Sequence, residues 1–356
     1  MLEEKHVFAS SNSSKGFFSY FDYIINPDEL KRIYILKGGP GVGKSSFIKK
    51  FGNKISSLGY EIEYIHCSSD ENSLDGLVVP HLKVALVDGT FPHLLDPKFP
   101  GAVDEIVNLG TYIDSKLLEK HKNQIVQINN SKSQLYRSAY RYLESAGIIS
   151  EEINSIYDKF TDDDKFTTLC KNAIDKFFTK KLSANKSGSM RKMFLEAYTS
   201  NGYVKYTDSL PSNLKVCALI GESSNYTSKL LEVVAEESIK RGFRTECYYR
   251  PLSPEKLQHV IIPELDLIFK SEESIMNCKY DEIINLHDIM DLENMKLHIS
   301  EIENNLHLLD LLTKNALNKL SEASKYHQLL EIFYVNSMDF KGVDRCLENI
   351  LSQYIN

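Results

Sequence analysis

Arg32-Ile33-Tyr34-Ile35-Leu36-Lys37-Gly38-Gly39-Pro40-Gly41-Val42-Gly43-Lys44-Ser45-Ser46-Phe47 is the stretch that decides the fold. The apolar run 32–36 reads as a strand and 47–51 as the continuation of a helix, and the loop between them satisfies G-x-x-x-x-G-K-[ST]. Strand, loop and helix in that order predict a phosphate-binding loop of the P-loop (Walker A) type. The loop residues are Gly38, Gly39, Pro40, Gly41, Val42, Gly43, Lys44, Ser45 and Ser46. The alternative is a glycine-rich turn that carries an exposed lysine.

The residue types suit polyphosphate binding. Glycines tolerate positive φ and let backbone N–H groups converge on phosphate oxygens at a helix N-terminus, where the helix dipole favours an anion. By this logic Lys44 contacts the β- and γ-phosphates and also acts in catalysis, and the Ser45 hydroxyl binds Mg²⁺. We therefore expect a nucleoside triphosphate, ATP with Mg²⁺, as the ligand.

A second motif lies further along the chain. The apolar run Val84–Val87 ends in Asp88, which is typical of a Walker B strand whose carboxylate holds Mg²⁺ directly or through water. Asp88 is thus predicted to be a metal ligand beside Ser45 and a catalytic residue beside Lys44. The alternative is an aspartate that only ends a strand at a turn.

The catalytic base is left open. Many ATPases place a glutamate directly after the Walker B aspartate, whereas Gly89 follows here. Carboxylates elsewhere are candidates, with solvated loop or helix-start positions as the alternative: Asp70, Glu71, Asp104 and Glu105. Four residues border the same region and are expected to pack or form hydrogen bonds: His66, Cys67, His81 and His93. Three arginines could supply a further cation, or be solvated or salt-bridged: Arg137, Arg141 and Arg191.

The chain contains an internal duplication. Residues 59–82 align without a gap on 242–265, at an offset of 183 (242 − 59). Residues 8–22 match 194–208 at an offset of 186, and 104–109 match 281–286 at 177. Three blocks in the same order argue against chance. The small polar stretch 185–189 predicts the boundary, giving domains 1–187 and 188–356.

The second half has lost the charges of the loop. The offset of 183 aligns Lys44 with Thr227, Asp88 with Ser271 and Gly43 with Tyr226, while Gly221 and Ser228 keep the types of Gly38 and Ser45. A tyrosine fills space meant for phosphate and disfavours positive φ. Lys229 lies on another side of the helix and cannot replace Lys44. We expect no ordinary triphosphate site in this half.

The predicted architecture is α/β, with two tandem P-loop NTPase-like parallel-sheet domains, each followed by long helices. Heptad spacing marks both helical segments. The seam positions are Leu118, His121, Ile125, Ile128, Lys132, Leu135, Ala139, Tyr142 and Ala146, and then Leu292, Met295, Ile299, Ile302, Leu306, Leu309, Thr313, Ala316, Leu320, Ala323, His327 and Leu330. Intramolecular helical-hairpin packing is one interpretation; a homo-oligomeric or partner-docking coiled coil is the other.

Composition excludes several classes of protein. The formal charge is 42 − 49 = −7 and the basic residues are scattered, which argues against nucleic-acid binding. No signal-peptide core or membrane-spanning run is present, so a cytoplasmic protein is expected. Six cysteines without a Cys-x-x-Cys pair favour reduced thiols over disulfides or a zinc site.

The order of these motifs resembles a bacterial family of duplicated P-loop ATPases. The likeness rests on the loop from Gly38 to Ser45, on residues 65–70 with 73–76, on 84–90 with Pro92-His93, and on 100–105. It covers nearly the whole chain and implies two P-loop-type domains with an ATPase or nucleotide-kinase-like activity, without a defined substrate. In that family the second half often keeps an intact loop, so Tyr226 and Thr227 depart from the pattern.

Three functions remain open from the sequence. The first is an enzyme that binds Mg-ATP at residues 38–46 and slowly hydrolyses it or transfers its phosphoryl group, with a structural or regulatory second half. The second is an interaction protein in which the nucleotide re-aims the heptad helices against a partner. The third is a small-molecule or nucleotide kinase with its acceptor pocket between the halves.

Overall fold

The computed structural model describes residues 4–24, 29–179, 188–221, 225–274 and 280–355. The first core is a six-stranded sheet in the order β1-β5-β6-β7-β4-β8. Its strands are β1 (Glu4–Phe8), β4 (Arg32–Lys37), β5 (Ile62–His66), β6 (Leu74–Val79), β7 (Val84–Asp88) and β8 (Asp104–Asn108). Helix α2 (Lys44–Ser56) packs on this sheet and buries Phe47, Ile48 and Phe51 against it. The expected strand, loop and helix therefore occur in the expected order.

The sheet is mixed, which corrects the expectation of a parallel one. β6 runs antiparallel to both of its neighbours, β5 and β7, while the other pairs are parallel. Residues 67–73 and 80–83 are the connections on either side of β6. Both are too short for a crossover, which takes a dozen or more residues, so β6 can only pair antiparallel.

The second core repeats the same topology, in agreement with the duplication. Its sheet has the order β9-β13-β14-β15-β12-β16, and each strand occupies the place of its counterpart in the first sheet. The strands are β9 (Ser189–Met193), β12 (Lys215–Ile220), β13 (Arg244–Tyr249), β14 (Leu257–Ile262), β15 (Leu267–Glu272) and β16 (Glu282–Asn285), and α6 (Asn225–Lys240) corresponds to α2. Below, positions related by the offsets of 186, 183 and 177 are called twin positions.

Small elements follow the same repeat. Two hairpins, β2 (Ser10–Ser13) with β3 (Gly16–Ser19) and β10 (Glu196–Thr199) with β11 (Gly202–Lys205), lie beside each other between the cores. The remaining short elements are α1 (Phe21–Ile24), η1 (Leu109–Tyr112), η2 (Thr207–Ser209), η3 (Pro263–Leu265), η4 (Leu286–Ile289), η5 (Lys296–His298), α3 (Ser115–Glu119) and α7 (Leu292–Met295).

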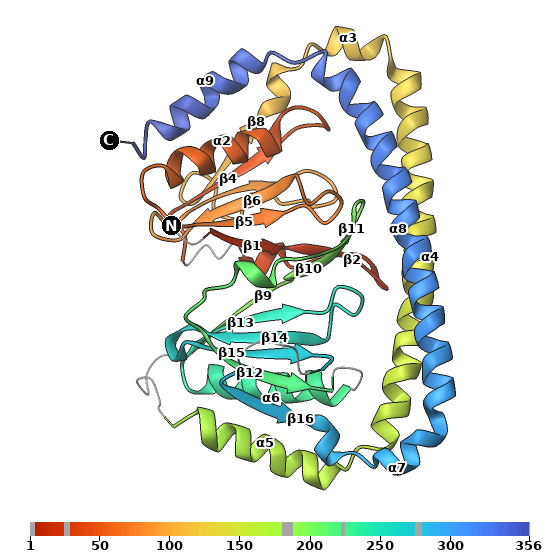
Figure 1. The fold of residues 1–356 in the computed structure, drawn as a ribbon. Helices are drawn as coiled ribbons and strands as arrows, with labels where there is room; N and C mark the ends of the chain where they lie inside the picture. The colour runs from red at the N-terminus through yellow and green to blue at the C-terminus, as the bar shows by residue number, and fades with distance from the viewer. Residues whose placement is uncertain (1–3, 25–28, 180–187, 222–224, 275–279, 356) are drawn as a thin grey trace.

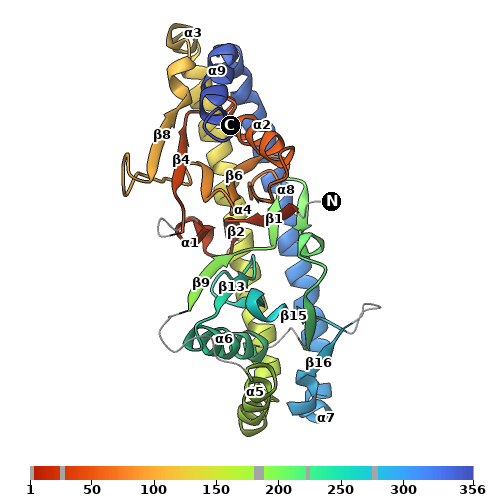
Figure 2. The same cartoon turned by 90° about the vertical axis from the view of Figure 1, so that its left-hand side faces the viewer.

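Two long helices join the cores. α4 (Lys122–Lys159) and α8 (Ile299–Val335) run side by side in opposite directions along both cores (Figures 1 and 2). Ala139, Ala146, Ala316 and Ala323 are fully buried seam positions. Intramolecular packing of the heptad helices is confirmed, although the partners come from different halves of the sequence. Within the described residues, no helix combines the length and the apolar character needed to cross a membrane.

Each core is completed by a helix from the other half of the sequence. α9 (Phe340–Leu351) packs on the first core, where Val343 and Leu347 share a buried cluster with Phe47. α5 (Asp163–Phe177) packs on the second core, where Cys170 and Ala173 are buried with residues of α6. Figure 1 shows both helices at opposite ends of the molecule. The predicted boundary at 185–189 lies mostly outside the described residues.

The two cores meet at their edge strands. Phe8, at the end of β1, exchanges both backbone hydrogen bonds with its twin Phe194, which follows β9, at 2.9 Å each. Beside this pair lies a cluster of four charges that are themselves two sets of twins: Lys5, Glu63, Arg191 and Glu246. Lys5 lies 3.1 Å from Glu63 and 2.7 Å from Glu246, and Arg191 pairs with Glu63 through both of its terminal nitrogens. The interface therefore follows an approximate two-fold axis.

Candidate functional site

The glycine-rich loop, residues 38–46, joins β4 to the N-terminus of α2. Gly41 has φ 71° and Gly43 φ 92°, in the left-handed region that favours glycine. Gly43 is the N-cap residue of α2, and no side chain caps the helix there. The first N–H groups of α2 therefore have no side-chain cap and are available to an anion, as expected at the head of a helix.

Lys44 and Asp88 lie together at this loop. The Lys44 ammonium donates to the carbonyl oxygens of Gly38 and Gly39 at 2.8 and 2.9 Å, and its Nζ lies 3.6 Å from Asp88 Oδ2. Asp88 reaches this place because β7 pairs with β4, and its Oδ1 accepts the Thr90 N–H at 2.8 Å. Burial raises the Asp88 pKa, and the neighbouring Lys44 charge opposes that rise. The two motifs found in the sequence thus form one charged site.

Ser45 has a structural partner in addition to any ligand. Its Oγ accepts the Leu74 N–H at 2.9 Å, and the twin Ser228 Oγ accepts the Leu257 N–H at 2.8 Å. A hydroxyl oxygen has two lone pairs, so the Ser45 oxygen still has one for a cation. Among the described residues, no group of three or more His, Cys, Asp and Glu side chains could hold a metal ion. A magnesium ion at Ser45 and Asp88 would need oxygens from a bound phosphate.

Asp75 extends the site and was missed by the sequence analysis. It lies on β6 and is buried, and its Oδ2 is 2.9 Å from Nε2 of the equally buried His93. Burial disfavours protonation of His93, but the Asp75 carboxylate outweighs it and raises the His93 pKa. The Asp75 charge also adds to the rise of the Asp88 pKa. The internal alignment could have identified Asp75, because its charge, like those of Lys44 and Asp88, is lost at the twin position, Gln258.

The four carboxylates considered as catalytic bases differ in their surroundings. Asp70 accepts from the Asn72 N–H at 3.2 Å and the Ser73 hydroxyl at 2.7 Å, in the loop after β5. Glu71 accepts from Asn201 of the second half at 2.9 Å. Asp104 anchors a loop by accepting the N–H groups of Lys98 and Phe99, and Glu105 is exposed on the edge strand β8. Asp70 interacts electrostatically with His327 and Glu331 of α8.

The remaining candidates have structural surroundings. His66 contacts His6 at 2.8 Å and the Glu71 carbonyl at 2.6 Å, and burial lowers its pKa to about 4. Burial raises the pKa of the Cys67 thiol, and His81 is exposed beside Tyr60. Arg191 belongs to the ion-pair cluster between the cores, and Arg137 and Arg141 are exposed on α4. The described cysteines, which exclude Cys278, are free thiols: Cys67, Cys170, Cys217, Cys247 and Cys346.

The end of α8 lies directly against the glycine-rich loop. A Cβ atom on Gly39 would lie 2.7 Å from the Tyr334 ring, and one on Gly41 would lie 2.9 Å from the Glu331 carbonyl oxygen. A Cβ on Gly43 would meet the Phe340 ring of α9 at 3.4 Å. The loop is thus enclosed by helices from the distant C-terminal part of the chain, and its glycines allow that approach as well as positive φ.

The twin loop of the second core is tied to protein groups instead. Thr227 Oγ1 donates to the Gly221 carbonyl at 2.7 Å, which replaces the contact of Lys44 with Gly38. Tyr226 Oη donates to Asp163 at 2.5 Å, and the Asn225 amide donates to Asp158 at 2.8 Å. Lys229 lies over the Tyr226 ring, 4.0 Å from its centre. Residues 222–224 lie outside the described residues.

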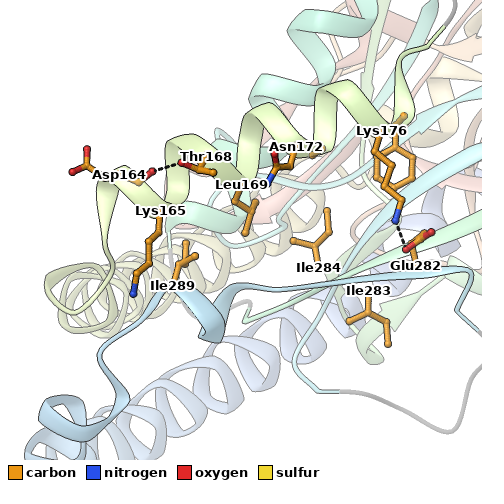
Figure 3. A pocket seen from close by; sticks show the side chains of 12 residues that line it. Asp164, Lys165, Thr168, Leu169, Asn172, Lys176, Glu282, Ile283, Ile284 and Ile289 are labelled. Atoms are coloured by element: carbon orange, nitrogen blue, oxygen red, sulfur yellow. Dashed lines mark hydrogen bonds and ion pairs between the residues drawn. The ribbon is translucent and has the colours of Figure 1, made fainter.

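A cavity of about 500 Å³ lies on the second core, between α5 and β16 (Figure 3). Leu169, Ile284 and Ile289 form its apolar floor, and the Lys176–Glu282 ion pair of 2.6 Å lies at one end. None of the residues that line it belongs to the glycine-rich loop or is among the charged residues around Lys44. The cavity is therefore separate from the Lys44 site.

Comparison with known proteins gives no match: no protein-family model, no curated protein and no solved structure is similar to this chain. The conclusions on function therefore rest on the residues and their geometry.

Proposed function

We propose that the first core binds ATP with Mg²⁺ at the glycine-rich loop and hydrolyses it slowly. The observation that carries the proposal is the position of Lys44. Its ammonium lies on the loop carbonyls of Gly38 and Gly39 and 3.6 Å from Asp88, at the uncapped head of α2. A cation, backbone N–H groups and a metal-binding carboxylate thus meet around one loop, as polyphosphate binding requires.

Each residue of the site has a role in this reaction. Lys44 would leave the loop carbonyls to contact the β- and γ-phosphates, while Ser45 and Asp88 would hold Mg²⁺, which neutralises phosphate charge when bound. A water oxygen then bonds to the terminal phosphorus as the bond to the bridging oxygen breaks. Asp70 and the Asp75–His93 pair are groups near the site that could take up the water's proton. Reduced thiols and abundant ATP make the cytoplasm the suitable compartment.

One observation favours a nucleotide-gated interaction as a second candidate function. Gly41 lies against the backbone of Glu331, so a loop that closes on phosphate presses directly on α8. A movement of α8 would be transmitted to the second core, because α8 packs against α4 and both helices run along both cores. Hydrolysis and gating can share the site, and the turnover rate separates them.

Lys44→Ala tests the proposal. Wild-type protein should be stabilised by Mg-ATP by about 2.7 kcal/mol at a concentration of 100 times Kd. Lys44→Ala should weaken binding by about 1.5–3 kcal/mol, because a charged contact is lost, and should abolish Mg²⁺-dependent phosphate release. Thermal shift, calorimetry and phosphate release measure these effects.

Lys54→Ala is the matched control, because Lys54 lies in the last turn of the same helix with an exposed side chain. It should behave as wild type in all three measurements. Equal stabilisation of Lys44→Ala and wild type by Mg-ATP would overturn the proposed site. Binding without phosphate release, accompanied by a nucleotide-dependent change in protease sensitivity of α8, would select the gating function instead.

A further inference from the structure

Charged and polar side chains interrupt the seam between α4 and α8 at one end. Lys132 Nζ lies 3.5 Å from His327 Nδ1, and His327 Nε2 lies 3.7 Å from Glu331 Oε1. These three residues, called the coil triad below, belong to both helices and are partly buried. Further along, the seam is built from buried small and apolar residues such as Ala139, Ala316 and Leu320.

The coil triad lies beside the glycine-rich loop. The backbone and Cβ of Glu331 face Gly41, as described above. Glu331 and His327 both interact electrostatically with Lys44 and Asp70. Burial, together with the charges of Lys132 and Lys44, lowers the His327 pKa to about 4. His327 is therefore neutral at neutral pH, and Lys132 is the cation of the triad.

The duplication supplies an internal control. The twins of Lys132, His327 and Glu331 are Leu309, Ser150 and Asn154, at the opposite end of the coil beside the second loop. A triad needed only to pair the helices would serve equally at both ends. Its charges are instead absent at the end where Thr227 replaces Lys44, Ser271 replaces Asp88 and Gln258 replaces Asp75. The triad thus occurs together with the intact loop.

We propose that the coil triad completes the nucleotide site of the first core, with Lys132 binding the terminal phosphate of the triphosphate. The inference rests on the proposed function and adds a residue to it. A lysine ammonium is a suitable point charge for phosphate, and the Lys132 side chain extends from α4 to His327, whose ring lies between it and Glu331. The ammonium contacts His327, His327 contacts Glu331, and Glu331 faces Gly41, so Lys132 is two side-chain contacts from the residue that lies against the loop. The terminal phosphate would then link the loop to both helices of the coil.

Lys132→Leu, which copies the twin Leu309, tests this role. Calorimetry should show Mg-ATP binding weakened about tenfold or more, and Mg-ADP binding changed less than about twofold, because the terminal phosphate alone loses a charged contact. Lys132→Arg should restore most of the preference for ATP over ADP. Lys122→Leu is the control, since Lys122 is exposed at the start of the same helix.

The outcomes separate this inference from the proposed function. If wild-type protein binds neither nucleotide, the proposed function and the inference that rests on it are both wrong. If wild type binds Mg-ATP and Lys132→Leu keeps the same ratio of ATP to ADP affinity, the inference alone is wrong. Equal weakening of both nucleotides would assign Lys132 a structural role in the coil and also overturn it. Circular dichroism of each variant shows that the helices are intact.

Discussion

The loop before α2 and the loop before α6 occupy the same place in the same topology, but their polar side chains have different partners. In the first core, Lys44 rests on its own loop carbonyls beside Asp88, and the neighbouring helices contribute the Tyr334 and Phe340 rings. In the second core, the twin loop is bonded to helix carboxylates through Tyr226 and Asn225. The first loop carries a lysine and an aspartate side by side, whereas the polar groups of the second loop are bonded to carboxylates of neighbouring helices.

The difference separates binding from folding within a single chain. Ser45 and Ser228 accept the backbone N–H groups of residues at twin positions, Leu74 and Leu257. Asp339 and Asp162 likewise cap twin helices, so these four side chains serve the fold. Lys44, Asp75 and Asp88 have lost their charges at the twin positions without loss of the topology. Those charges are therefore dispensable for the architecture, which is the expected behaviour of ligand-binding residues.

The largest change in stability is expected at the charge cluster between the cores, where both halves of the sequence keep their charged residues. Glu63→Gln removes the buried partner of both Lys5 and Arg191, and breaking such a buried pair costs about 3–5 kcal/mol. Its twin, Glu246→Gln, should cost less, because Glu246 forms a close ion pair with Lys5 and accepts from the Tyr248 hydroxyl, whereas Glu63 forms close ion pairs with both Lys5 and Arg191. Urea unfolding of both variants measures the asymmetry. Equal losses in the free energy of unfolding would contradict this prediction and show that the two glutamates contribute equally to stability.

The same cluster predicts a dependence of stability on pH. Burial opposes ionisation of Glu63, but Arg191 and Lys5 outweigh it and lower the Glu63 pKa from 4.5 to about 2. A carboxyl whose folded pKa is lowered stabilises the fold above its unfolded pKa, and the gain is lost as pH falls from about 4.5 towards 2. The free energy of unfolding should drop by about 3 kcal/mol across that range. Glu63→Gln should flatten this part of the profile, and Glu61→Gln, at an exposed neighbour, should not.

A smaller change in stability is expected at the loop before α6 in the second core. Tyr226→Phe removes the hydroxyl that donates to Asp163 and should lower the free energy of unfolding by about 1–2 kcal/mol, with nucleotide binding at the first core unchanged. A double-mutant cycle with Asp163→Ala isolates the pairwise contribution. A coupling energy near zero would show that Tyr226 only fills space in the second loop.

The smallest and most discriminating effect concerns Ser45 and Ser228. Either change to alanine leaves a backbone N–H without its acceptor and should cost about 1 kcal/mol of stability. Ser45→Ala alone should also weaken Mg²⁺-dependent ATP binding. If the two variants differ in stability but not in nucleotide affinity, Ser45 is not a metal ligand.

The sequence predicted the local parts of this structure and not its long-range connections. The strand expected at 32–36 and found at Arg32–Lys37, the strand ending in Asp88 and the helical seams follow from short patterns that depend on neighbouring residues. The antiparallel β6 follows from connection lengths that the apolar pattern of its residues does not reveal. Contacts of Lys44 with Asp88 could be anticipated from the motifs, whereas Asp75 with His93, and Glu331 beside Gly41, depend on elements that meet only in three dimensions.

The crossing of α9 onto the first core has a consequence for the order of folding. The apolar surface around Phe47 stays uncovered until Val343 and Leu347 arrive, nearly three hundred residues later in the chain. A chain emerging from the ribosome can therefore form the sheet of the first core before α9 has been made to cover it. Contacts between such distant residues form slowly because of the entropy of closing long loops. The Lys44 site can thus close only after residues 340–351 have been synthesised.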